Sequence, residues 1–163
     1  MKRKLPVKID YDFTAPLDSV AELLTKPQFL VDRCLALGGL SATGDSSEDD
    51  GRIVIKTTRE LEADLPSIVK KLLGSVTTLD LVEVWEKNGD GWGGTWDVEI
   101  KGQPISVHGD FELLPTSEGC HYSADAKVTA KVRLIGKKIE QSLEGTIATD
   151  LVADLDYTND QLK

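Results

Sequence analysis

The sequence has few of the residues on which metal-binding and catalytic proteins depend. Its 163 residues include two cysteines, two histidines and one methionine. Cys34 and Cys120 form no CxxC pair and have no histidine or cysteine at metal-ligand spacing, so both are predicted to be small buried hydrophobic residues. No HExxH motif, EF-hand loop or nucleophile elbow occurs. These absences argue against a zinc site, a disulfide and the common hydrolase mechanisms, and neither a metal nor a cofactor is expected.

Positive charge is also scarce. The chain has 19 lysines and arginines against 28 acidic residues, a formal net charge of −9. This balance argues against nucleic acid, which requires a basic face, and weakens any case for docking on anionic lipid. No apolar run reaches transmembrane length, and Lys8, Asp10 and Asp12 interrupt what would be the apolar core of a signal peptide. A soluble, cytoplasmic protein without stable membrane insertion is expected.

Two motifs that could carry chemistry fail on their context. Residues 89–94 satisfy the pattern GxGxxG, but a dinucleotide site needs a helix after the glycines, and residues 95–100 alternate as a strand does. His108 and Asp110 could form a general-base pair, yet both alternate to the outer, solvated face of a predicted strand. No catalytic residue is therefore predicted.

What the sequence has instead is strict alternation. From Tyr122 to Val132 every second residue is apolar, and the residues between them are polar. A period of two predicts a strand with one buried face and one face in water. Similar segments, separated by plain turns, predict strands at residues 7–13, 40–46, 52–61, 77–87, 92–100, 104–114 and 120–133.

The helices are predicted by a different spacing. Between residues 136 and 160 apolar side chains recur every fourth residue, which indicates an amphipathic helix that needs a partner surface. Two short helices are predicted after the first strand. One begins near Pro16 and ends near Leu24, and the other begins at Pro27 and stops at Gly38.

The predicted order, in a single domain over residues 1–163, is strand, two short helices, six antiparallel strands and a long helix. This order resembles the α+β helix-grip fold of the START/polyketide-cyclase-like superfamily (SRPBCC), in which a seven-stranded curved antiparallel sheet wraps around a long C-terminal helix. Residues 13–20 are similar to the first strand–helix junction of that family, and residues 132–140 resemble the last junction in an uncharacterised bacterial branch. The resemblance implies a hydrophobic cavity for a lipid, sterol, polyketide or similar ligand, but no particular activity.

Two strands interrupt their apolar face with a charge. Glu83 shares a face with Trp85, and Arg59 shares a face with Ile53. If these faces are the inner ones, Arg59 and Glu83 enter the cavity from neighbouring strands, where they pair or where Arg59 binds a ligand carboxylate. The alternative is that both lie at the open end of the sheet and reach water.

The other predicted ligand contacts are apolar and come from strands, the long helix and the insert at residues 65–74. Pro66 and Gly74 bracket this insert as a short helix, predicted to be the lid of the cavity or, alternatively, a plug at the open end of the sheet. The alternative for the aromatic residues is a filled core. The predicted ligand-binding set is Trp85, Trp96, Phe111, Tyr122, Leu143, Ile147, Leu151, Ile68, Leu72, Arg59 and Glu83.

The predicted function is therefore non-covalent binding of a hydrophobic small molecule, for transport or sequestration, by a monomer or weak dimer. Two alternatives remain open. One is a cyclase- or dehydratase-type enzyme that uses the same cavity, a reading less favoured because no catalytic dyad is evident. The other is a ligand-free module that binds a protein partner through its sheet.

Overall fold

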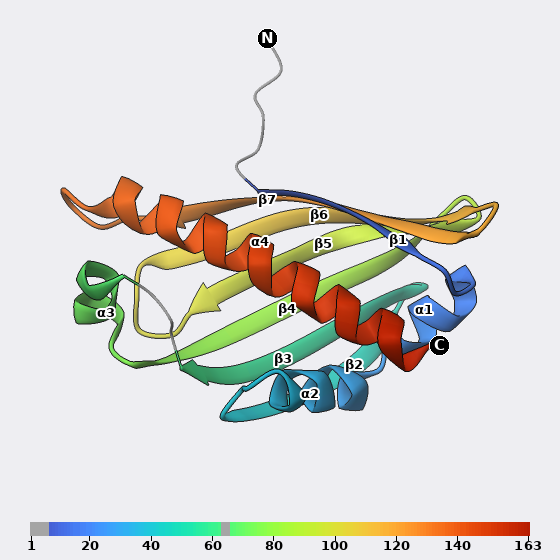
Figure 1. The fold of residues 1–163 in the computed structure, drawn as a ribbon, viewed down its shortest axis with the longest axis horizontal. Helices are drawn as coiled ribbons and strands as arrows, with labels where there is room; N and C mark the ends of the chain where they lie inside the picture. The colour runs from blue at the N-terminus through green and yellow to red at the C-terminus, as the bar shows by residue number, and fades with distance from the viewer. Residues whose placement is uncertain (1–6, 63–65) are drawn as a thin grey trace, which may run out of the picture.

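The structure, a computed structural model, describes residues 7–62 and 66–163. Seven antiparallel strands form one curved sheet in the order β1-β7-β6-β5-β4-β3-β2 (Figure 1). Strands β2 to β7 pair in sequence order, each with its neighbour in the chain, and β1 pairs with the free edge of β7. The strands are β1 (Val7–Phe13), β2 (Ser41–Asp49), β3 (Arg52–Glu62), β4 (Val76–Asn88), β5 (Gly91–Ile100), β6 (Ile105–Thr116) and β7 (Gly119–Ala130).

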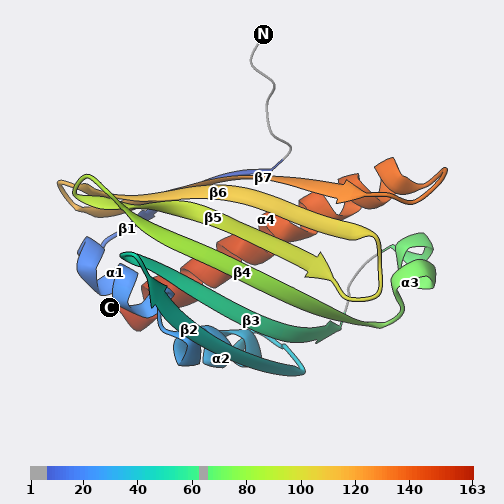
Figure 2. The ribbon, with the colours of Figure 1, turned by 180° about the vertical axis from the view of Figure 1, so that it is seen from behind.

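Four helices accompany the sheet in the described part of the chain. The short helices α1 (Leu17–Leu24) and α2 (Pro27–Ala36) follow β1, and α3 (Ser67–Leu73) joins β3 to β4 at one end of the molecule. The long helix α4 (Gly136–Gln161) runs obliquely across the concave face of the sheet, as the front and back views show (Figures 1 and 2). Among the described residues, no helix combines the length and the apolar character needed to cross a bilayer.

The predicted fold class is confirmed: this is an α+β helix-grip arrangement with two short helices after the first strand. In β6 the apolar residues alternate with polar ones, and this alternation matches burial. Every second residue from Ile105 to Leu113 is buried on the concave face, and the residues between them are exposed. Two predicted strand ends were wrong by three residues, because the last strand ends at Ala130 and not at Arg133, and β2 continues to Asp49 and does not end at Ser46. The Lys131 amide still donates to the Pro104 carbonyl at 2.9 Å, but the chain then turns through Leu134, whose φ is 72°.

The two ends of α4 pack more closely than its middle. Ile139, Leu143 and Leu155 are buried, whereas Ile147 and Leu151 between them are only partly buried. A straight helix crossing a curved sheet cannot touch it everywhere, so the middle of α4 stands away from β4 and β5. The space left there is the candidate site.

Candidate ligand-binding cavity

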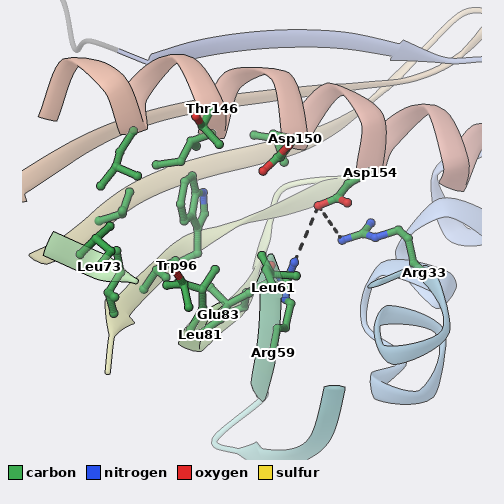
Figure 3. A pocket seen from close by; sticks show the side chains of 18 of the residues that line it. Arg33, Arg59, Leu61, Leu73, Leu81, Glu83, Trp96, Thr146, Asp150 and Asp154 are labelled. Atoms are coloured by element: carbon green, nitrogen blue, oxygen red, sulfur yellow. Dashed lines mark ion pairs between the residues drawn. The ribbon is translucent and has the colours of Figure 1, made fainter. Parts of the chain in front are cut away.

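A cavity of about 270 Å³ lies between the concave face of the sheet and α4 (Figure 3). Inward positions of β3 to β7 form its floor, and α4 forms its roof through residues that include Leu143, Thr146 and Ile147. Leu73 of α3 borders it at one end, and Arg33 of α2 reaches it at the other. Most of the lining side chains are apolar, and several charged ones gather near Arg33.

The structure places the predicted ligand-binding residues in three environments. The residues that line the cavity are Arg59, Glu83, Trp96, Tyr122, Leu143, Ile147 and Leu151. Trp85 and Phe111 instead border a second void of about 30 Å³, with their ring centroids 4.7 Å apart in the core. From α3 it is Leu73 that reaches the cavity, while Ile68 is exposed and Leu72 packs against the core. Leu65, the first residue of the predicted lid, lies outside the described residues.

A glycine beneath Trp96 helps to shape the cavity. Trp96 on β5 pairs with Gly109 on β6, and a Cβ at position 109 would overlap the indole ring. The indole therefore packs directly against the β6 backbone at Gly109, an approach that a side chain at this position would prevent. An alanine at position 109 would push the indole toward α4 and reduce the cavity.

A buried ionic cluster connects α2, β3 and α4. The Arg33 guanidinium lies 3.4 Å from the Asp154 carboxylate and donates to the Thr158 hydroxyl at 3.1 Å. Arg59 lies 4.0 Å from the same Asp154 oxygen, so two cations share one carboxylate (Figure 3). The sequence left three environments open for Arg59: an ion pair with Glu83, a ligand carboxylate, or water at the open end of the sheet. In the structure Arg59 is 19% exposed and its ion pair is with Asp154 of α4. This cluster polarises one end of an otherwise apolar cavity.

Glu83 occupies an inner position of β4, opposite Ile55 on β3 and Trp96 on β5. It forms no ion pair within the described part of the chain, and the Trp85 indole donates to it at a long 3.4 Å. Burial raises the pKa of Glu83, because water no longer stabilises the carboxylate, although Arg33, the Trp85 hydrogen bond and Arg59 oppose this effect. Burial also raises the pKa of Asp150 on α4, as does the neighbouring Asp154 carboxylate.

Several polar groups of the lining have unused hydrogen-bonding capacity. The Trp96 indole nitrogen and the Thr77 hydroxyl are buried and have no hydrogen-bond partner among the described residues. Burial and the nearby Glu83 raise the pKa of Tyr122, whose phenol therefore stays protonated. An unpaired buried polar group costs about 1–3 kcal/mol. Neither the Trp96 nitrogen nor the Thr77 hydroxyl oxygen is accessible from the cavity, so a ligand oxygen could pair with them only if their side chains moved.

The comparison with protein families assigns the chain. A family model described as "Protein of unknown function (DUF2505)" matches residues 8–162. The chain belongs to this family. No curated protein matches the sequence, so the DUF2505 assignment brings no activity with it.

Solved structures are similar to this DUF2505 protein in fold. The crystal structure of TTHA0849 from Thermus thermophilus matches with a TM-score of 0.68 and 13% identity, over 96% of this chain and 95% of that one. Protein MLL2253 from Mesorhizobium loti matches with a TM-score of 0.55 and 15% identity, over 94% and 93% of the two chains. A conserved protein from Geobacillus kaustophilus matches with a TM-score of 0.52 and 16% identity, over 94% of this chain and 90% of that one. At such identities the likeness shows the fold alone.

Sequence reasoning missed the residues that complete the ionic cluster. Arg33 follows Leu30 by three residues and precedes Cys34, which places a charge on the apolar face of α2. Asp154 and Thr158 continue the stripe of Ile147 and Leu151 at helical spacing. A charged residue on the apolar face of a helix is unusual, so Arg33 and Asp154 could each have been identified from the sequence. Opposite charges in such positions on two helices favour a buried ion pair.

Glu83→Gln is expected to flatten the pH dependence of stability. With its pKa raised on folding, Glu83 contributes stability that is complete below its unfolded pKa of about 4.3 and is lost as the pH rises through the folded value. The neutral amide avoids this loss, so the variant should melt at a higher temperature than the wild type at pH 7 and lose that advantage toward pH 4. Arg33, Arg59, Asp154 and Tyr122 face the same site and are unchanged in both proteins.

Thermal unfolding between pH 4 and pH 8 measures this effect. The exposed Glu112→Gln on β6 is the matched control and should follow the wild-type profile. Parallel profiles for wild type and Glu83→Gln would show that burial does not govern the titration of Glu83.

Proposed function

We propose that this protein binds a hydrophobic small molecule non-covalently in the cavity between the sheet and α4, and so carries or sequesters it. The observation that supports this proposal is the cavity of about 270 Å³ itself. Protein interiors are close-packed, and voids larger than a water molecule are few. This volume exceeds the roughly 150 Å³ that holds benzene and approaches the roughly 300 Å³ at which small-molecule sites begin.

The lining supports a compact, mostly apolar ligand that carries an oxygen. Trp96 and Tyr122 offer aromatic surface to such a ligand. Glu83, with its raised pKa, is able to donate from its protonated form as well as to accept. An apolar pocket with a few placed polar groups is the usual composition of a small-molecule site.

We also infer membership of the START/polyketide-cyclase-like superfamily. The seven-stranded curved sheet wrapped around α4, and the two short helices after β1, support this placement. The fold by itself does not choose between binding, transport and reaction. The binding proposal therefore rests on the cavity and its lining.

Thr146→Trp is expected to abolish ligand binding. Thr146 points into the cavity from α4 (Figure 3), and an indole there occupies the space that the ligand needs. Native mass spectrometry of the purified wild type should show a co-purified apolar mass that Thr146→Trp lacks. The apolar dye Nile red should bind the wild type with a fluorescence increase, and its affinity for the variant should fall at least roughly 10-fold, or 1.4 kcal/mol.

Thr149→Trp is the matched control, since position 149 lies on the same helix but is exposed. It introduces the same side chain and should leave dye binding unchanged. Equal dye binding by wild type and Thr146→Trp would place the ligand elsewhere, and a wild type without a bound mass or dye affinity would contradict the proposal.

A further inference from the structure

One end of this acidic molecule is basic. We call it the basic end and define it as residues 66–76, 101–104 and 131–138. These segments contain seven lysines and arginines and no acidic residue, so the rest of the chain has twelve basic residues against 28 acidic ones. One exposed acid, Glu62 of β3, borders them, since it pairs with Val76. All seven side chains belong to residues that are at least partly exposed, and none forms an ion pair with any residue that the structure describes. They are Lys70, Lys71, Lys101, Lys131, Arg133, Lys137 and Lys138.

Hydrogen bonds hold the three segments together. The Lys131 amide donates to the Pro104 carbonyl at 2.9 Å, which ties the β7–α4 connection to the β5–β6 turn. The side-chain amide of Gln103, in that turn, donates to the backbone carbonyl of Leu72 in α3 at 3.4 Å. Both views show α3 and the start of α4 at the same end of the molecule, away from the C-terminus (Figures 1 and 2).

An exposed apolar side chain lies in the β7–α4 connection, between Arg133 and Lys137 in the sequence. Leu134 is 98% exposed, and its φ of 72° lies in the left-handed region that a leucine rarely adopts. Ile68 and Val76, in the segment that contains α3, are also exposed. A leucine held in water by a strained backbone has no role in the packing of this chain.

The start of α4 adds to the local positive potential. Lys137 and Lys138 stand in its first turn, where the helix dipole favours acids, and this turn contains none. The first acid along the helix, Glu140, accepts a hydrogen bond from the Ala130 amide at 3.0 Å. The repulsion within this group of cations would be relieved by an anionic surface outside the protein.

We propose that the basic end docks on anionic phospholipid membrane surfaces, with Leu134 inserted among the headgroups. Each cation close to an anionic bilayer contributes attraction over about a Debye length, and an exposed apolar side chain flanked by cations suits the interface. Leu73 of α3 borders the cavity at this same end, so docking brings the cavity toward the bilayer. The docking itself does not depend on the cavity having a ligand.

A membrane fits these features better than a nucleic acid does. The segments that carry the cations lie at one end of the molecule (Figure 1), and the fully exposed apolar side chain among these segments, Leu134, is aliphatic rather than aromatic. Base stacking requires an aromatic surface, and the three segments contain no aromatic residue. Leu134 is therefore the residue that distinguishes the two partners.

The full-length protein can be tested by flotation with phosphatidylcholine vesicles, with and without about one-third phosphatidylserine, at about 0.1 M salt. Binding is expected to the anionic vesicles alone and should fall at high salt. Lys137→Gln with Lys138→Gln should weaken it roughly 25-fold, at about 5-fold per cation. Leu134→Asn, which suits the left-handed backbone, should weaken it about 10-fold.

Lys56→Gln with Lys127→Gln is the matched control, because both lysines are exposed on the convex face of the sheet. This variant should bind like the wild type. Failure of the wild type to bind anionic vesicles, or an equal loss in the control, would overturn the proposal. So would tight binding to single-stranded DNA that Leu134→Asn leaves unchanged, since that result indicates a nucleic-acid partner.

Discussion

Arg33→Ala is expected to lower the free energy of unfolding by about 3–5 kcal/mol, a large part of the roughly 5–15 kcal/mol that stabilises a domain. The Arg33 side chain is only 7% exposed and lies against Asp154 and Thr158 of α4. Its removal leaves the Asp154 carboxylate, 18% exposed, with Arg59 at 4.0 Å as its remaining cation among the described residues. The loss comes from stranding a buried charge and not from the attraction alone.

Chemical denaturation measures this loss, and a double variant tests its cause. Arg33→Met with Asp154→Leu removes both partners and keeps most of the volume, so it should recover much of the stability that Arg33→Ala loses. If Arg33→Ala unfolds within about 0.5 kcal/mol of the wild type, as a surface substitution does, the cluster does not hold α2 against α4.

Ile139→Asp is expected to unfold the domain. Ile139 lies in the first turn of α4 and is 0% exposed. Burying an unpaired carboxylate there costs several kcal/mol. Circular dichroism should show loss of cooperative unfolding at neutral pH. Without α4 the apolar inner faces of β1 and β7, which it contacts, would be open to water.

Ile147→Asp is the matched control for this prediction. Two turns further along the same helix, Ile147 borders the cavity and is only partly buried, so water that enters the cavity can hydrate the carboxylate. This variant should fold cooperatively but lose affinity for an apolar ligand. Unfolding of both variants would mean that the middle of α4 is packed as tightly as its start.

Part of the candidate site could be predicted from the sequence. Arg59 and Glu83 were found because each interrupts the apolar face of a strand with a charge, but the sequence left open whether that face is the inner one. Their partners could not be found in the same way. Asp154 and Arg33 are 121 positions apart, and only the crossing of α4 over the sheet brings them to 3.4 Å.

Net charge was a poor guide to the surface. A value of −9 argued against anionic partners because it averages over the whole chain. The tertiary structure gathers seven cations from three separate segments at one end. A local potential depends on neighbours within about a Debye length, roughly 8–10 Å, and those neighbours are set by the fold.

The sequence by itself determined the order of the elements and the buried face of the regularly alternating strands. Periods of two and of about four record which residues meet the core, and this local pattern was sufficient for β6, β7 and α4. It could not give a buried face for β2, which is exposed along nearly all of its length. Only the tertiary structure decided that Trp85 and Phe111 fill the core while Trp96 and Tyr122 border a cavity. All four aromatic residues have the same inward pattern in their strands. They differ in what lies above them. Leu24 of α1 and Leu30 of α2 border the small void beside Trp85 and Phe111, whereas the middle of α4 lies over the cavity beside Trp96. No periodicity along the chain records that difference.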